Sequence, residues 1–197
     1  MKDIRNVVTR GRLSVLLIVV LLVIDQIIKI LVKTNMCLGD AIHITDWFYI
    51  DFVENNGMAY GMTFINKFLL SLLRIAAICI IGWYIHRQIK VRARYCYIIL
   101  LSMVFAGAAG NIFDSMFYGL VFDASTPFDV SSVVPFGTGY APFLMGKVVD
   151  MFYFPLIEWD MPNYPLLPYA GEHCIFFSPI FNFADATISC GMILIFI

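Results

Sequence analysis

Long apolar runs, each about as long as a bilayer is thick, constrain the fold of this chain more than any other feature. Three of them cover residues 13–33, 67–87 and 94–114, and a fourth covers residues 181–197. A helix of about 20 apolar residues, rising about 1.5 Å per residue, crosses the hydrocarbon core of a membrane. The fourth run is slightly shorter and ends with the chain. The pattern predicts four transmembrane helices.

Composition supports an integral membrane protein. The chain is 61% hydrophobic and 14% charged, whereas soluble chains have about 45–50% and about 25%. A cleaved signal peptide is the alternative for the first run, but the run is too long and no small-residue cleavage site follows it. We therefore expect a single all-α integral membrane domain over residues 1–197, with a small β element and a long loop outside the membrane.

The distribution of charge predicts the orientation. Lys and Arg cluster before the first run and between residues 87 and 94, whereas residues 34–66 hold four carboxylates and no Lys or Arg. Residues 114–180 hold seven carboxylates and a single Lys. Because Lys and Arg favour cytoplasmic loops, both termini should be cytoplasmic and the loops 34–66 and 115–180 should lie outside. The charge pattern matches no nucleic-acid-binding surface.

The two outer loops differ in character. The segment "AIHITDWFYIDFV" is rich in β-branched and aromatic residues, which predicts a short strand or hairpin within residues 38–64. The loop 115–180 is long enough to have a function or a structure of its own. Cys37 and Cys174 fall in these loops, and a disulfide between them is the weaker alternative to two free thiols.

Ionisable residues inside membrane segments are candidates for function. Asp25 and Lys29 are four residues apart in "DQIIK" and share a helix face. They form either part of a functional site or a structural ion pair between helices.

Two further polar pairs have matching i, i+3 spacing near the outer ends of their helices. They are Asn111 with Asp114 in "GNIFD" and Asn182 with Asp185 in "FNFAD". The outer segment "VENNGMAYGM" adds the amide of Asn55 and the conformational freedom of Gly57. Together these residues predict a polar site at the outer boundary of the membrane.

One more carboxylate, Asp150 in "GKVVDMFYF", stands in an apolar and aromatic stretch, and Asp123 in "YGLVFDAS" has a similar setting. Two carboxylates in a low-dielectric pocket share a proton. One can then act as a base toward water and the other as an acid toward a carbonyl oxygen. The histidines lack metal-ligand spacing, and no nucleotide-binding motif is present. We expect neither a metal nor a cofactor.

The motifs "DQIIK", "VENNGMAYGM", "GNIFD", "GKVVD" and "FNFADATIS", in this order over residues 13–197, resemble the bacterial lipoprotein signal peptidases (signal peptidase II). The resemblance implies an aspartyl endopeptidase of the bacterial inner membrane that removes a signal peptide before a diacylglyceryl-modified cysteine. Its partners would be the prolipoprotein substrate and membrane lipid, and we expect a monomer. The implied catalytic residues are Asp150 and Asp185. The implied supporting residues are Asp25, Asn55, Gly57, Asn111, Asp114 and Asn182.

The partner of Asp185 stays open between two aspartates. The family's usual short spacing would select Asp123, whereas Asp150 requires an insertion of about 27 residues. We favour Asp150 because "GKVVDMFYF" matches the motif better, which makes residues 120–145 the insert. The rival functions are an ion-coupled transporter, which would spread its carboxylates through the membrane depth, and a structural subunit, which would not gather them at the outer end.

Overall fold

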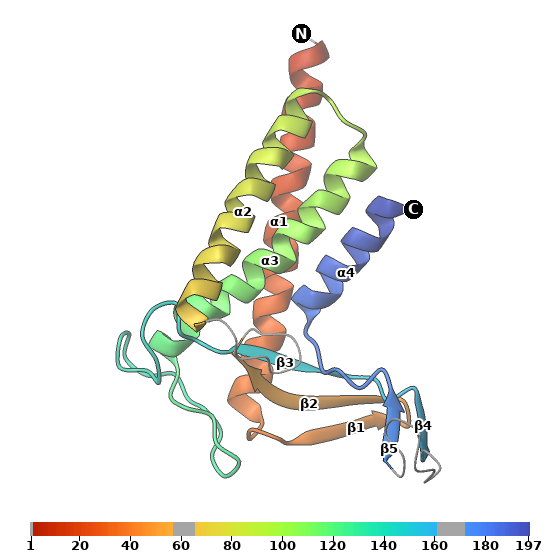
Figure 1. The fold of residues 1–197 in the computed structure, drawn as a ribbon. Helices are drawn as coiled ribbons and strands as arrows, with labels where there is room; N and C mark the ends of the chain where they lie inside the picture. The colour runs from red at the N-terminus through yellow and green to blue at the C-terminus, as the bar shows by residue number, and fades with distance from the viewer. Residues whose placement is uncertain (1, 57–65, 161–171) are drawn as a thin grey trace.

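The computed structural model describes residues 2–56, 66–160 and 172–197 (Figure 1). Its helices are α1 (Lys2–Asn35), α2 (Lys67–Lys90), α3 (Tyr95–Val121) and α4 (Phe183–Phe196). Its strands are β1 (Ala41–Thr45), β2 (Phe48–Asn55), β3 (Val148–Tyr153), β4 (Ile157–Asp160) and β5 (His173–Phe176). The helices form a bundle, and the strands gather at one end of it.

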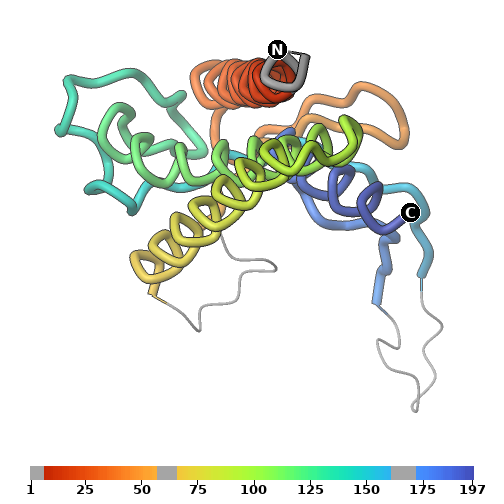
Figure 2. Tube along the Cα trace, turned by 90° about the horizontal axis from the view of Figure 1, so that it is seen from above, coloured from red at the N-terminus to blue at the C-terminus, as the bar shows by residue number. Residues whose placement is uncertain are grey.

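Helix α3 is the centre of the bundle. It packs against each of the other helices, and Figure 2 shows α1 on one side of it, with α2 and α4 on the other. The outward side chains of α1 and α2 are apolar and exposed, as Leu16 and Ile80 illustrate. Residues 7–33, 67–90 and 95–121 are each long and apolar enough to cross a membrane. The chain is therefore a multi-pass membrane protein.

Small residues let α3 and α4 approach closely, as membrane helix packing favours. A Cβ atom on Gly107 would lie 2.3 Å from the backbone oxygen of Ala184, and a Cβ on Gly191 would lie 3.1 Å from the backbone oxygen of Leu100. Gly107 belongs to α3 and Gly191 belongs to α4, so each helix offers the other a surface without a side chain at one point.

The helix boundaries differ from the sequence prediction in all four helices, and α2 continues to Lys90 rather than ending at residue 87. Helix α3 continues to Val121 rather than ending at residue 114, and α1 begins at Lys2 rather than at residue 13. Helix α4 has 14 residues and is shorter than a full span. The prediction for α3 was wrong because Asp114 looked like the polar end of a helix. In the structure this carboxylate is buried against a lysine of α1, so its charge does not end the helix.

The strands form two small antiparallel sheets. The predicted hairpin within residues 38–64 is confirmed as β1 and β2, and β3 joins it to give the order β1-β2-β3. Strands β4 and β5 pair separately. The all-α prediction was therefore incomplete, because residues 148–153 form a strand and not part of a loop. Their run of β-branched and aromatic residues is typical of a buried strand.

A small apolar core lies between the first sheet and the helices. Phe52, Val149 and Met151 are fully buried there and pack with Tyr118 and Phe122 at the end of α3. Since Val149 and Met151 flank Asp150 in β3, this core fixes the position of the carboxylate. All five cysteines are free thiols, so the disulfide alternative is wrong.

Candidate active site

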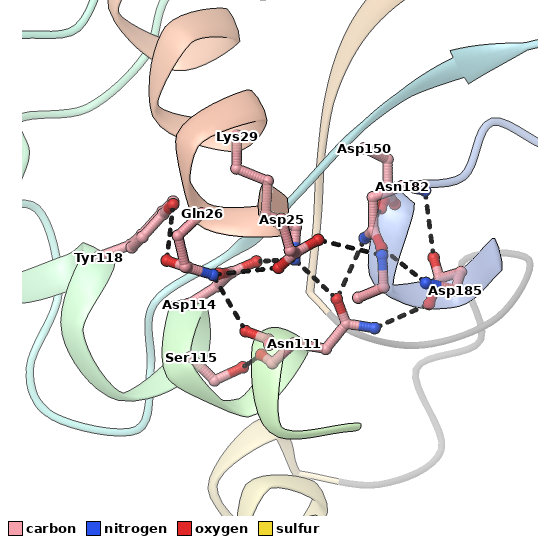
Figure 3. Close-up of polar contacts among 12 residues, drawn as sticks. Asp25, Gln26, Lys29, Asn111, Asp114, Ser115, Tyr118, Asp150, Asn182 and Asp185 are labelled. Atoms are coloured by element: carbon pink, nitrogen blue, oxygen red, sulfur yellow. Dashed lines mark hydrogen bonds and ion pairs between the residues drawn. The ribbon is translucent and has the colours of Figure 1, made fainter. Parts of the chain in front are cut away.

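A short backbone bridge joins β3 to the start of α4. The backbone N–H of Phe152 donates to the carbonyl oxygen of Phe181 at 2.7 Å, and the N–H of Phe181 donates to the carbonyl oxygen of Phe152 at 3.0 Å. Asp150 lies two residues before this bridge and Asp185 lies four residues after it. The bridge therefore brings two carboxylates 35 residues apart in sequence to one place (Figure 3).

Asp150 is buried, with 4% of its surface exposed. Its Oδ1 accepts a hydrogen bond from Nδ2 of Asn182 at 2.6 Å, and its Oδ2 accepts one from Nδ2 of Asn55 at 3.2 Å. Burial, together with the negative charge of Asp185, raises the pKa of Asp150 to about 7, although the two amide donors oppose this shift. A carboxyl group with this pKa is poised to exchange a proton near neutral pH.

Asp185 lies in the first turn of α4, where a capping box holds it. Oδ1 of Asn182 accepts from the backbone N–H of Asp185 at 2.9 Å, and Oδ2 of Asp185 accepts from the backbone N–H of Asn182 at 3.4 Å. Nδ2 of Asn111 donates to the other oxygen of Asp185 at 2.7 Å. The half-buried carboxylate thus faces the positive end of the α4 dipole and an amide donor.

Asn182 links the two carboxylates. Its Oδ1 caps α4 next to Asp185, while its Nδ2 donates to Asp150 and, at 3.1 Å, to Oδ1 of Asn111. Both ends of this one amide are therefore committed. Rotating the amide by half a turn would break contacts to both carboxylate-bearing elements.

Lys29 fixes the orientation of Asn111. Its Nζ donates to Oδ1 of Asn111 at 2.9 Å, so the amide nitrogen of Asn111 must point the other way, toward Asp185. Lys29 is fully buried and lies 3.0 Å from Oδ2 of Asp25 and 2.7 Å from Oδ2 of Asp114. Two carboxylates surround this one ammonium group, as a charge buried in a membrane protein requires.

Further contacts tie this buried group of charges to the rest of the site. Oδ1 of Asp25 accepts from the backbone N–H of Ala184 in α4 at 3.0 Å. Nε2 of Gln26 donates to Oδ1 of Asp114 at 2.8 Å, and Oε1 of Gln26 accepts from the hydroxyl of Tyr118 at 3.1 Å. Helices α1, α3 and α4 are thereby joined beside Asp150 and Asp185 (Figure 3).

The structure thus gathers Asp25, Asn55, Asn111, Asp114, Asp150, Asn182 and Asp185 into one network. Gly57 lies outside the described residues. Asp123 lies elsewhere, in the loop after α3. Its carboxylate accepts from the backbone N–H and the hydroxyl of Ser132, both at 2.7 Å, and these donors lower its pKa. It is bound to its own loop and not to Asp185.

The predicted site omitted Gln26 and Tyr118, and it left the role of Lys29 undecided. The spacing of "DQIIK" placed Lys29 on the face of Asp25 but left its role open. Gln26 is next to Asp25 in the chain and gave no signal, because neighbouring positions on a helix point in different directions. The reach of its long side chain toward α3 becomes visible only when the helices are packed.

Comparisons with known proteins agree in the family they indicate. The family model described as Signal peptidase (SPase) II matches residues 17–197. The lipoprotein signal peptidase of Porphyromonas gingivalis is 45% identical over 190 residues, which are 95% of this chain and 83% of the relative. That of Amoebophilus asiaticus is 33% identical over 180 residues, which are 88% of this chain and 71% of the relative.

The fold also has solved counterparts. Two bacterial membrane enzyme structures, determined by the in meso method at 2.3 Å and 1.9 Å, match with TM-scores of 0.61 and 0.60. Each is 23% identical in sequence. The matches cover 92% and 93% of this chain and 84% and 89% of the solved chains. The arrangement of helices and sheet described above is therefore a known membrane-enzyme fold.

Proposed function

The chain belongs to the signal peptidase II family, and from that premise we propose that it is a membrane aspartyl endopeptidase with Asp150 and Asp185 as its catalytic pair. It removes signal peptides from prolipoproteins, as the names of its relatives indicate. The observation that carries the proposal is the pair of carboxylates joined through the amide of Asn182, one of them with a pKa raised to about 7.

The two environments suggest different roles. Asp150 is buried and holds its proton near neutral pH, which suits a general acid. Asp185 faces a helix N-terminus and amide donors and is more exposed, which suits a base toward water. The division of roles resembles other enzymes in which two carboxyl groups differ only in their surroundings. Each role refers to the protonation state in which the reaction begins.

The reaction follows from these roles. Asp185 takes a proton from water as the water oxygen attacks the scissile carbonyl carbon, and Asp150 gives its proton to the carbonyl oxygen. The resulting gem-diol collapses when the C–N bond breaks. The departing amine takes the proton from Asp185, and a diol hydroxyl returns a proton to Asp150. The enzyme is restored, and the net change is addition of one water across the peptide bond.

We place the site at the outer face of the inner membrane, with both termini in the cytoplasm. Support comes from the basic segments at residues 2–12 and 87–94, which lie at the end of the bundle opposite the sheets. A substrate with a diacylglyceryl-modified cysteine would keep its acyl chains in the bilayer, where each buried CH₂ group contributes about 0.8 kcal/mol. Cleavage just before that cysteine then puts the peptide bond at the membrane boundary.

The test compares single Asp→Asn variants at positions 123, 150 and 185 in a prolipoprotein cleavage assay with purified full-length protein. We expect no cleavage by the Asp150→Asn and Asp185→Asn variants and near-normal cleavage by Asp123→Asn. Full activity of the Asp185→Asn variant would reject the aspartyl mechanism. Loss of activity at positions 123 and 185, with cleavage kept in Asp150→Asn, would instead mean that Asp123 is the true partner of Asp185.

A further inference from the structure

A second buried charge lies one residue away from the site, on the opposite face of β2. Glu54 is nearly fully buried and Lys33 is fully buried. Oε1 of Glu54 accepts from Nζ of Lys33 near the end of α1, and Oε2 accepts from Nζ of Lys147 at 2.9 Å, just before β3. One carboxylate therefore connects β2 to the end of α1 and to the residue just before β3.

Two residues of the insert, residues 120–145, complete the contacts around Glu54, Lys33 and Lys147. Oγ of Ser125 accepts from Lys33 at 2.7 Å and donates to Glu54 at 2.9 Å. The ring of Tyr140 lies 5.2 Å from the ammonium of Lys33 and 5.8 Å from that of Lys147, and its hydroxyl accepts from the backbone N–H of Lys147 at 2.6 Å. We name these five residues the Glu54 cluster. Within it, the Lys33–Glu54 ion pair is shielded from water, whereas Lys147 is partly exposed.

The register of the sheet couples this cluster to the catalytic pair. Val53 is opposite Asp150 and Glu54 is opposite Val149. Because side chains alternate along a strand, Asn55 points to the same face as Asp150, and Glu54 points to the other face. The 3.2 Å contact from Asn55 to Oδ2 of Asp150 is made by the last residue of β2. The position of that last residue depends on what holds the end of the strand.

We propose that Glu54 is a positioning residue for the reaction: by binding Lys33 and Lys147 it holds the end of β2 so that Asn55 reaches Asp150. This inference rests on the proposed function, since it assigns Glu54 a role through the catalytic pair. It also gives the insert a purpose, because Ser125 and Tyr140 complete the cluster. Glu54 touches neither aspartate, so its effect on the reaction passes through the neighbouring amide.

The pH dependence of activity separates positioning from general support. The hydrogen bond from Asn55 opposes the rise in the pKa of Asp150 that burial causes. When Asn55 moves away, the pKa of Asp150 rises further. Activity that requires protonated Asp150 then persists to higher pH. The alkaline limb of the plot of kcat against pH therefore moves to higher pH. A variant that merely folds less well loses activity without moving this limb.

The experiment uses full-length protein in detergent or liposomes and a diacylglyceryl-modified prolipopeptide. It compares Glu54→Gln, Asn55→Ala and the double variant, with Glu158→Gln as the matched control. Glu158 is also a strand glutamate, but it is 51% exposed and lies in β4. We expect Glu54→Gln to lower kcat by roughly tenfold or more, with little change in KM. The alkaline limb of its kcat profile should lie at higher pH. The control should match the unmodified protein.

The double variant tests the route of the effect. If Glu54 acts through Asn55, the double variant is no slower than Asn55→Ala alone, because the second change removes an interaction already lost. Should Glu54→Gln fail to fold with Lys33 left unpaired, the Glu54→Gln/Lys33→Met protein replaces it, since it removes both charges.

Asp150→Asn in the same assay keeps the two hypotheses apart. If Asp150→Asn cleaves normally, the proposed function fails. If it is inactive while Glu54→Gln keeps a normal kcat, the positioning role alone fails. The positioning role also fails if the alkaline limb of the kcat profile does not move in Glu54→Gln. It fails as well if the reduction of kcat in the double variant equals the product of the two single reductions.

Discussion

Replacing Asp150 by asparagine should stabilise the protein at alkaline pH while abolishing its activity. The pKa of Asp150 is raised from 3.8 to about 7 by burial and by the charge of Asp185. A carboxyl group with a raised pKa stabilises the folded state most when it is protonated in both the folded and the unfolded chain. That contribution is lost as pH rises through the folded-state pKa. Asparagine has no charge to bury, so the variant avoids the loss.

The size of the effect follows from the two pKa values. A difference of one unit corresponds to about 1.4 kcal/mol. Between pH 5 and pH 8 the unfolded carboxyl is already ionised, whereas the folded one ionises only near pH 7. The unmodified protein should lose about 2.5 kcal/mol over this interval relative to Asp150→Asn. For a chain of this length that is a relative shift in Tm of about 5–10 °C.

The assay is thermal unfolding of both proteins in the same detergent at pH 5 and pH 8. Comparing the two pH values cancels any pH-independent effect of the asparagine on packing. Asp123→Asn is the control with the opposite sign, because donors from Ser132 lower the pKa of Asp123. That carboxylate stabilises the fold above its unfolded pKa, so its replacement should not help at pH 8. If Asp150→Asn gains nothing between pH 5 and pH 8, the argument from burial is wrong.

Three other changes test the supporting structure. Lys29→Met leaves two buried carboxylates without their cation and should cost about 3–5 kcal/mol in the free energy of unfolding; unchanged denaturation would contradict the described ion pairs. Asn182→Ala removes the α4 cap, worth about 1 kcal/mol, and should reduce kcat far more than it reduces stability. Gly107→Ala puts a methyl group against α4 and should destabilise the protein by about 1–3 kcal/mol. Gly11→Ala, which meets no atom within 4 Å, should not destabilise the protein when both variants are unfolded in parallel, because alanine favours a helix over glycine.

Much of the site could be predicted from short stretches of sequence because its signals are local. The spacing of Asn182 and Asp185 is that of a capping box, which needs only one turn of helix. The ion pair of Asp25 and Lys29 likewise needs only the i, i+4 geometry of α1. Both contacts lie within single helices, so no knowledge of the packed fold was required.

The role of Lys29 shows where local reasoning ends. Its spacing indicated a partner on the same helix, but its second carboxylate and its amide partner both come from α3. The same packing explains the error at residue 114. A charge that looked like the end of a membrane segment is neutralised by another helix, and α3 therefore continues through it. The Glu54 cluster gave no signal at all, since its members come from four separate stretches of the chain.

The sequence by itself determined the three long apolar helices and the polar residues that are out of place in them, because hydropathy and helical spacing act over a few turns. It left open whether Asp123 or Asp150 stands beside Asp185, since both follow similar apolar residues. Only the tertiary structure decided this. Pairing of β3 with β2, and its bridge to Phe181, depend on strands and helices meeting across the fold. Contacts of that kind have no fixed spacing in the chain, so no local pattern records them.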